Sequence, residues 1–189
     1  MDAEATPPGY SWKRDPLVWA YSILMFLPII MVIIFYNYYR LDVCVFAGWI
    51  LLALSVVIIL LAGSEFRTKG GAPKGESLVH TTTLVDSGIY AVVRHPQYLG
   101  FILFVLALVL MSQHWLSAIS GVAGSALFYK DVLREEQMTV AKFGNDYVRY
   151  MDRVPRMNFF IGIWRLLRRR SKQSQTHAGG AVKSNNTRE

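Results

Sequence analysis

The sequence predicts an all-α integral membrane protein with about four transmembrane helices and additional C-terminal amphipathic or interfacial helices. Hydrophobic residues make up 53% of the 189 residues and charged residues only 17%, below the roughly 25% of an average soluble domain. Two uncharged runs near the N-terminus each have the about 20 residues needed to cross the hydrocarbon core of a bilayer. A third uncharged stretch, residues 95–129, is too long for one span.

The first two runs predict a transmembrane hairpin over residues 17–63, after a polar tail at residues 1–16. Leu17–Tyr36 forms the first predicted span. It contains Pro28, which membrane helices tolerate because neighbouring groups satisfy the freed backbone carbonyl. Val43–Gly63 forms the second span, because it carries no charge and is long enough to cross.

Residues 64–170 are predicted to form the functional core, with a second membrane hairpin inside it. Residues 64–94 carry several glycines, a proline and charged side chains, which is typical of a loop on the water side of a membrane. Polar residues at 112–114 then divide the long uncharged stretch into two helices, Gln97–Met111 and Trp115–Leu133. We expect the second of these helices to continue into the charged residues that follow it.

An amphipathic segment follows the second hairpin. Phe143, Tyr147 and Met151 recur at helical spacing, which predicts a helix over residues 137–151 with an interruption at Gly144. These side chains form the apolar face of the predicted helix, and charged residues occupy its other positions.

The C-terminal part combines apolar and basic residues. Phe159–Arg170 contains both kinds, so we expect it to lie in the membrane interface, where anionic lipids attract its arginines. Residues 171–189 are polar and are predicted to be disordered. The single cysteine, Cys44, lies in an apolar run, which excludes a disulfide framework and a thiolate metal site. We therefore expect no metal.

The placement of basic residues predicts the orientation in the membrane. The formal net charge is +7, and the turn of the first hairpin holds a single basic residue, Arg40. Most other lysines and arginines lie in the N-terminal tail, the loop at 64–94 and the C-terminal part. The positive-inside rule therefore places both termini and the active site in the cytosol. Because the basic residues flank apolar runs, they indicate membrane lipids as a partner and argue against nucleic acid.

Folding the second hairpin about His114 brings its two open ends together. One end carries Arg94 and His95, and the other carries Glu135 and Glu136. Free amides at the helix start and the basic side chains favour an anion such as a carboxylate, while the glutamates favour an ammonium group. Because ionisable residues at the edge of hydrocarbon are expensive, a functional site is the default hypothesis. The pattern predicts a zwitterionic ligand at the membrane face.

An ordered set of short elements runs through residues 80–160. Its members are Gly88-Ile89-Tyr90, Arg94-His95-Pro96-Gln97-Tyr98-Leu99-Gly100, Glu135-Glu136, Phe143-Gly144, Tyr147, Tyr150 and Val154-Pro155. In this order the set resembles the isoprenylcysteine carboxyl methyltransferase family, and the wider group that contains phospholipid N-methyltransferases. The specificity of the resemblance comes from the order of the elements, and residues 1–62 match only as generic membrane spans.

The resemblance implies that S-adenosylmethionine is held by the last two spans and the segments beside them. It implies cofactor contacts at Tyr90, His95, Pro96, Gln97, Tyr98, Glu135 and Glu136. A further cofactor-contacting stretch of the family matches Thr82, Thr83, Leu84 and Val85. The first position of that stretch is histidine in the family and threonine in this chain.

Methyl transfer from a sulfonium mainly requires that donor and acceptor be aligned. His95 or a glutamate is a candidate base for an amine acceptor, and Arg94 and Arg134 are candidates for holding an anionic acceptor head. The eukaryotic family members place an arginine for the substrate carboxylate four residues before the first cofactor-binding glutamate, and that position is Asp131 here. The family's substrate therefore does not follow from the resemblance alone.

We predict an S-adenosylmethionine-dependent methyltransferase for a lipophilic or lipidated acceptor, and first of all carboxyl methylation of an isoprenylcysteine-like substrate. The close alternative is phospholipid N-methylation of the phosphatidylethanolamine type. A sterol-reductase-like enzyme has a similar C-terminal segment, but those relatives are much longer and have more spans. A non-enzymatic membrane scaffold remains a further alternative, and its function would not depend on His95 or Glu135.

Overall fold

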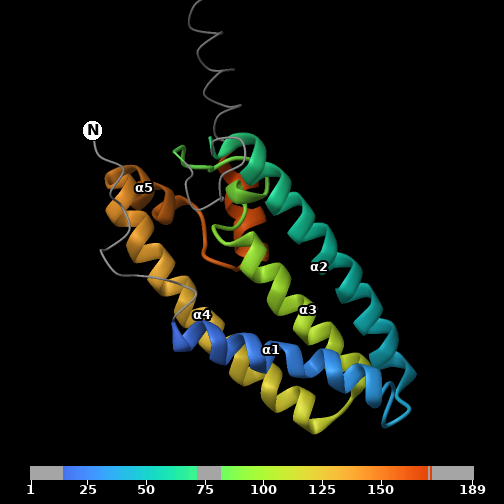
Figure 1. The fold of residues 1–189 in the computed structure, drawn as a ribbon. Helices are drawn as coiled ribbons and strands as arrows, with labels where there is room; N and C mark the ends of the chain where they lie inside the picture. The colour runs from blue at the N-terminus through green and yellow to red at the C-terminus, as the bar shows by residue number, and fades with distance from the viewer. Residues whose placement is uncertain (1–14, 72–81, 170, 172–189) are drawn as a thin grey trace, which may run out of the picture.

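The computed structural model describes residues 15–71, 82–169 and 171, and the regular elements in these ranges are all helical. The expected polar tails lie almost entirely outside the described residues. The elements in chain order are α1 (Pro16–Ile34), α2 (Asp42–Lys69), the short 3-10 helix η3 (Gly88–Ala91), α3 (Pro96–Ser112), α4 (Trp115–Phe143) and α5 (Asn145–Arg153). In Figure 1, α2 lies alongside α3, while α1 crosses α4.

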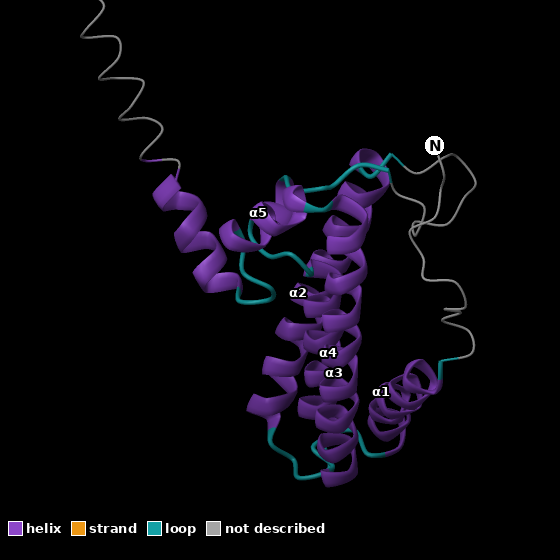
Figure 2. Cartoon of the chain, turned by 90° about the vertical axis from the view of Figure 1, so that its left-hand side faces the viewer, coloured by secondary structure: helices purple, strands orange, loops and turns teal. Residues whose placement is uncertain are grey.

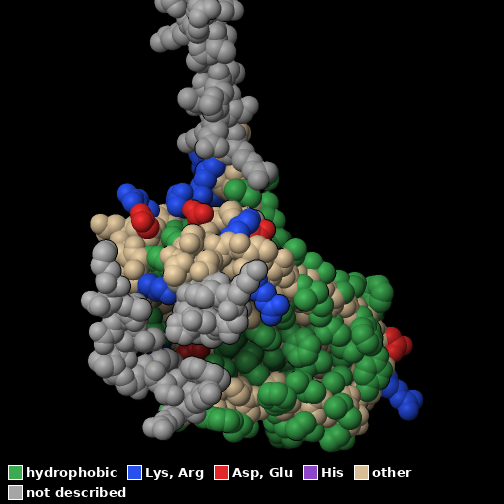
Figure 3. Space-filling model, turned by 45° about the horizontal axis from the view of Figure 1, so that its top comes forward, with side chains coloured by type: hydrophobic (Ala, Val, Ile, Leu, Met, Phe, Trp, Pro, Cys, Tyr) green, Lys and Arg blue, Asp and Glu red, His purple; other side chains and the backbone are tan. Residues whose placement is uncertain are grey.

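The first hairpin has the character of membrane-spanning helices. By length and composition, α1 and α2 can each cross a membrane, and only 11% and 17% of their most apolar windows are buried inside the protein. The central helix of a soluble protein is mostly buried, so these exposed apolar surfaces indicate a membrane protein. In Figure 3 a broad apolar surface covers much of the molecule, and most of the charged side chains in view gather at one end.

The two helices of this hairpin differ from the predicted spans mainly at their ends. Asp15 caps α1, because its side chain accepts a hydrogen bond of 2.8 Å from the amide of Leu17. The helix stays continuous through Pro28 and ends at Ile34. The second helix, α2, runs six residues past the predicted end at Gly63, to Lys69. Basic residues in its last turn favour this extension, because they interact well with the negative end of the helix dipole.

The second hairpin turns at Gln113, which adopts the left-handed conformation with φ of 55°. Beyond the turn, α4 continues ten residues past Leu133, to Phe143. Gly144 then has φ of +56°, a conformation that glycine adopts without strain, and it separates α4 from α5. The helix that the sequence predicts over 137–151 is therefore divided between the end of α4 and the whole of α5.

Residues 159–169 form a further helix after α5. Figure 2 shows it on the outside of the bundle, on the side opposite α1.

Tyr147 and Tyr150 of α5 form a buried cluster with Val154, against which Leu84 and Met151 pack. This cluster fixes α5 against the segment that precedes η3.

Candidate active site at the open end of the second hairpin

The two open ends of the α3–α4 hairpin meet at a buried contact between an imidazole and a carboxylate. His95 precedes α3, where Pro96 occupies the first turn and needs no amide hydrogen bond. From the other arm, Glu136 places its Oε1 atom 3.2 Å from Nε2 of His95. Each side chain is only 5% exposed. Residues 41 positions apart are thus joined at the base of the hairpin.

Glu136 is surrounded by basic side chains. Its Oε1 atom lies 3.0 Å from Nη2 of Arg94. Its Oε2 atom accepts hydrogen bonds from Nη2 and Nε of Arg156, at 2.7 Å and 3.0 Å. Both carboxylate oxygens are therefore engaged by the protein itself. A carboxylate with three basic neighbours acts as a brace that holds those neighbours in place.

A strand-like backbone contact adds to this brace. The amide of Arg94 donates to the carbonyl of Pro155 at 3.0 Å, and the amide of His95 donates to the carbonyl of Arg156 at 3.1 Å. Arg156 also donates to the Tyr129 hydroxyl of α4 at 2.6 Å. Residues 154–158 therefore form a strap across the hairpin's open end, tied to both arms.

The basic neighbours control the ionisation of Glu136, which lies beyond the apolar part of α4. Burial by itself raises the pKa of this carboxyl group. The hydrogen bonds from His95 and Arg156 and the charge of Arg94 outweigh burial, and they lower the pKa to about 2. The hydrogen bonds of Arg156 with Glu136, and next with the Tyr129 hydroxyl, raise the pKa of Arg156 against the opposing effect of burial. Glu136 is therefore a carboxylate at neutral pH.

Arg94 has hydrogen-bond donors without partners among the described residues. Its side chain is only 7% exposed, yet its Nε and Nη1 atoms have no hydrogen-bond partner among the described residues. A buried donor without a partner costs about 1–3 kcal/mol, and such groups are uncommon in folded proteins. Arg94 is thus held by Glu136 through one nitrogen and is available to bind an anion through the other two.

Glu135 has the opposite character. This half-buried carboxylate forms no ion pair with any residue in the described part of the chain. It interacts instead with the hydroxyl of Tyr98 and acts electrostatically on Tyr90 and Tyr147. Burial, together with Glu135 and Glu65, raises the pKa of Tyr90 to about 12. A carboxylate without a cation, close to several aromatic rings, is suited to bind a positively charged group.

Tyr147 shows that these charges belong to one region. Burial raises the pKa of its hydroxyl, the carboxylates Glu136 and Glu135 raise it further, and the guanidinium groups of Arg94 and Arg156 oppose them. One side chain of α5 is therefore close enough to interact with both glutamates and both arginines.

The other predicted cofactor residues surround this centre at different depths. Pro96 is buried beside His95, and Gln97 is exposed at the start of α3. Val85 and Tyr90 pack with Ala62 of α2 in a small buried cluster. Tyr90 is fixed from the other side as well, because its carbonyl accepts a hydrogen bond of 2.7 Å from the Tyr150 hydroxyl.

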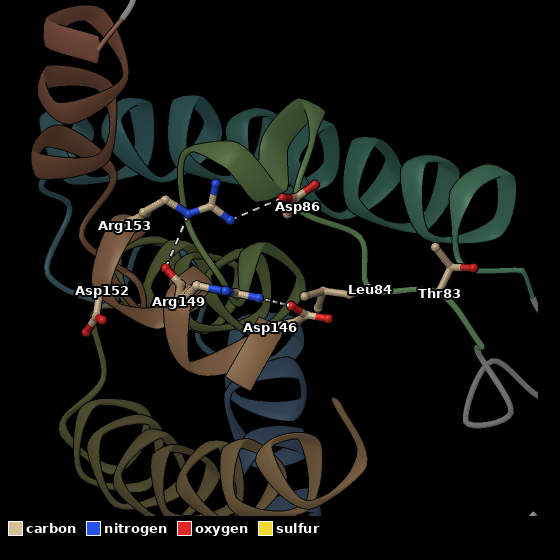
Figure 4. Close-up of a pocket in the computed structure, with 7 residues that line it drawn as sticks. All are labelled: Thr83, Leu84, Asp86, Asp146, Arg149, Asp152 and Arg153. Carbon is tan, nitrogen blue, oxygen red and sulfur yellow. Dashed lines mark hydrogen bonds and ion pairs between the residues drawn. The ribbon is translucent and has the colours of Figure 1, made fainter. Parts of the chain in front are cut away.

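Residues 82–85 form one wall beside this centre. Leu84 packs on the cluster of Tyr147 and Tyr150, whereas Thr82 and Thr83 are exposed. An open cavity of about 650 Å³ lies beside Thr83 and Leu84, and Figure 4 shows the residues that line it. Its lining residues are Thr83, Leu84, Asp86, Asp146, Arg149, Asp152 and Arg153. The Arg94–Glu136 cluster does not line this cavity.

Arg134 lies apart from the cluster. Its side chain is about half exposed and forms an ion pair of 2.8 Å with Asp15, the cap of α1. Asp131, one turn earlier on α4, accepts a hydrogen bond of 3.2 Å from the Tyr21 hydroxyl of α1. Both residues therefore attach α1 to α4, and the structure does not bring Arg134 to His95.

Sequence reasoning missed Arg156, which is central to the site. The residue directly follows Val154-Pro155, the last element of the ordered set, so a signal was present. Its role depends on the strap folding back onto α3, which the spacing of the motif does not specify.

Comparison of the sequence with known proteins identifies its family. Residues 43–146 match the phospholipid methyltransferase family. The chain is also similar to the protein-S-isoprenylcysteine O-methyltransferase of Homo sapiens, with 34% identity over 95 residues that cover 50% of this chain and 32% of that protein. The corresponding protein of Schizosaccharomyces pombe is 29% identical over 110 residues, 53% of this chain and 47% of that protein.

A plant relative gives a similar result. Protein-S-isoprenylcysteine O-methyltransferase B of Arabidopsis thaliana is 29% identical over 106 residues, which cover 51% of this chain and 54% of that protein. The chain thus spans about half or less of the length of the curated relatives it matches. The family match extends over more than half of the chain and includes η3, α3 and the whole of α4. On this basis the protein belongs to the phospholipid methyltransferase family.

Proposed function

We propose that this protein is a membrane-embedded methyltransferase that uses S-adenosylmethionine and acts on a lipophilic acceptor. The observation that carries the proposal is the binding capacity left open by Arg94 and Glu135 at the open end of the hairpin. Arg94 has two buried nitrogens without partners, and Glu135 has no cation among the described residues. A ligand with a carboxylate and an ammonium group satisfies both.

The donor set fits the amino-acid end of this cofactor. Arg94 would hold the carboxylate, assisted by the free amides at the start of α3. Glu135 would hold the ammonium group, and the rings of Tyr90, Tyr98 and Tyr147 near that carboxylate suit the positive sulfur. When bound, S-adenosylmethionine supplies a methyl group on a cationic sulfur, which an acceptor displaces in line.

The protein's own residues have distinct tasks in this scheme. Glu136 is a positioning residue, because its oxygens hold Arg94, His95 and Arg156 in place. Burial of the cluster excludes water, which strengthens the interaction of Arg94 with an anion. Of the two arginines considered for an anionic group, we propose Arg94, because Arg134 is occupied by Asp15 on the far side of α4.

We further propose a four-span arrangement with the site facing the cytosol. The 17 residues of α3 are apolar but short for a full crossing, so its charged end would lie near the interface. The apolar first part of α4 would form the fourth span. The clustering of basic residues around the 64–94 loop and the C-terminal part supports the cytosolic placement.

For the acceptor, we propose first a carboxylate of the isoprenylcysteine type. Three relatives whose names state this substrate, and the absence of any need for a base with a carboxylate acceptor, support this choice. The match to the phospholipid methyltransferase family favours a second candidate, an amine headgroup of a phospholipid. An amine must lose a proton before it attacks, and His95, which contacts Glu136, would accept that proton.

Calorimetry of the purified protein in detergent tests the cofactor. We expect heat of binding with S-adenosylmethionine, and a loss of affinity of about 10- to 100-fold for Glu135→Gln, because one charge-assisted contact is removed. The matched control is Asp42→Asn, the same chemical change at the opposite end of the molecule, which should bind normally. A folded protein that takes up no cofactor would contradict the proposal and favour a scaffold.

Product analysis with a labelled methyl group tests the acceptor. A base-labile methyl ester supports carboxyl methylation, whereas a base-stable methylamine on a phospholipid supports the second candidate. His95→Gln separates them further, because the loss of a base should lower the rate with an amine acceptor and affect a carboxylate acceptor less.

A further inference from the structure

The helix at residues 159–169 is attached to the site but stands outside the bundle (Figure 2). It begins after Asn158, whose side chain accepts a hydrogen bond of 3.0 Å from the amide of Ile161. Gly162 packs so closely on the backbone of Val92 that an added Cβ atom would lie 2.0 Å from the carbonyl oxygen. Only glycine permits this close approach. The contact holds the helix against Val92, which precedes Arg94 by two residues.

One face of this helix is apolar and uncovered. Phe160 is 85% exposed, and Trp164 and Leu167 are each 59% exposed. Their spacing of three and four residues places them on one side of the helix. Large side chains at this degree of exposure are unfavourable in water, so the face requires an apolar environment.

The neighbouring face is basic. Arg165, Arg168 and Arg169 recur at helical spacing and, with Trp164, line a hollow of about 320 Å³. Arg168 lies over the Trp164 ring, 5.3 Å from its centre. Among the described residues, the guanidinium groups of Arg165 and Arg169 donate hydrogen bonds to the backbone carbonyls of Asp152 and Arg153. Within the described part of the chain, none of the three arginines forms an ion pair with a carboxylate.

No carboxylate in the described part of the chain therefore compensates the positive charge in this hollow. Burial lowers the pKa of Arg169 most, and repulsion by the nearby guanidinium groups of Arg153 and Arg165 lowers it further. An oxyanion with several oxygens relieves this repulsion and accepts hydrogen bonds from more than one arginine.

We propose that this hollow binds the phosphate of an anionic lipid headgroup while the apolar face enters the membrane interface. The combination of aromatic and aliphatic residues with adjacent arginines is that of a helix lying on an anionic bilayer surface. The contact of Gly162 with Val92 and the hydrogen bond of Arg156 with Glu136 connect this helix to the segment that carries Arg94. The proposal depends on the membrane location and not on methyl transfer.

Hydrogen exchange of the full chain in lipid nanodiscs tests the proposal. One set of discs contains phosphatidylcholine alone, and the other contains phosphatidylcholine with phosphatidylglycerol. We expect amides of residues 160–169 to exchange about tenfold more slowly in the anionic discs, because docking suppresses local opening. Equal exchange in the two lipids overturns the proposal, and this comparison needs no mutation.

Charge-matched variants sharpen the result. The variant R165Q/R168Q/R169Q should lose the difference between the two lipids, whereas R40Q/K69Q/R149Q, which removes three basic charges elsewhere, should keep it. Inorganic phosphate added to phosphatidylcholine discs distinguishes a lipid site from a soluble-anion site. If free phosphate gives the same protection as the anionic lipid, the hollow is not a membrane-docking site and the proposal fails.

Discussion

The two ends of the α3–α4 hairpin differ in how far their polar side chains are satisfied by hydrogen bonds. At the turn, the amide of Gln113 uses its full capacity: it accepts from the amides of Tyr39 and Leu41 and donates to Asn37 and to the carbonyl of Leu41. At the open end, Arg94 is more deeply buried but leaves two nitrogens without partners. A saturated junction holds elements together, whereas an unsaturated one has capacity for a ligand.

The environment of the histidine differs between the ends in the same way. His114 at the turn stacks on the ring of Phe35, with 4.4 Å between ring centres, and caps α4 through Nδ1. His95 at the open end contacts a carboxylate within a charged cluster. The first histidine stabilises a turn, and the second lies where charges can be rearranged by binding.

The largest expected effect concerns the brace. Glu136→Leu leaves Arg94, His95 and Arg156 without their shared carboxylate, and we expect it to lower the free energy of unfolding by about 3–5 kcal/mol. Thermal or urea unfolding in detergent measures this. Glu136→Gln, which retains hydrogen-bonding capacity, should cost clearly less. Equal stability of all three proteins would mean that the cluster does not support the strap.

The second prediction addresses the free donors. Arg94→Met should weaken binding of S-adenosylmethionine by about 10- to 100-fold, while stability changes little, because the substitution also removes two unsatisfied buried donors. Calorimetry and thermal unfolding on the same samples separate the two quantities. A loss of stability with unchanged affinity would indicate that Arg94 is only structural.

The third prediction concerns the saturated end. Gln113→Met removes four hydrogen bonds that tie the two turns together, and it should lower the free energy of unfolding by about 1–2 kcal/mol because water replaces part of them. Cofactor affinity should not change, since the turn lies at the other end of α3. An equal loss of affinity would contradict the separation between a structural end and a binding end.

The smallest expected effect is a dependence of stability on pH, which appears only in acid. The pKa of Glu136 is lowered to about 2 in the folded protein, against 4.5 ordinarily. The ionised form therefore stabilises the fold fully above about pH 4.5, and this contribution is lost as the pH falls toward 2. The thermal midpoint of the unmodified protein should fall more steeply over this range than that of Glu136→Gln. Parallel curves would exclude Glu136 as the group responsible.

Much of the fold followed from local patterns. Uncharged runs located α1, α2 and α3 to within a few residues, except for the longer end of α2. Gly144 was expected to interrupt the last amphipathic segment, and it separates α4 from α5. The extent of α4 was less accurate, because the pattern changes from apolar to amphipathic while the helix itself continues.

The assignment of individual charges did not follow from the sequence. Glu135 and Glu136 are neighbours in the chain, but consecutive residues on a helix point about 100° apart, so they face different surroundings. Only the packing of α4 against α3 and α5 decides that Glu136 meets His95 and that Glu135 faces the tyrosines. The same packing turns Arg134 toward Asp15.

The sequence by itself determined that the chain is helical and apolar, and that opposite charges stand at the two open ends of a hairpin. These properties are local, because they depend on composition and periodicity within a single segment. The tertiary structure alone decided that Arg156 returns from far along the chain to share Glu136 with Arg94. That arrangement depends on contacts between distant residues, and such contacts leave no periodic signal in any one segment.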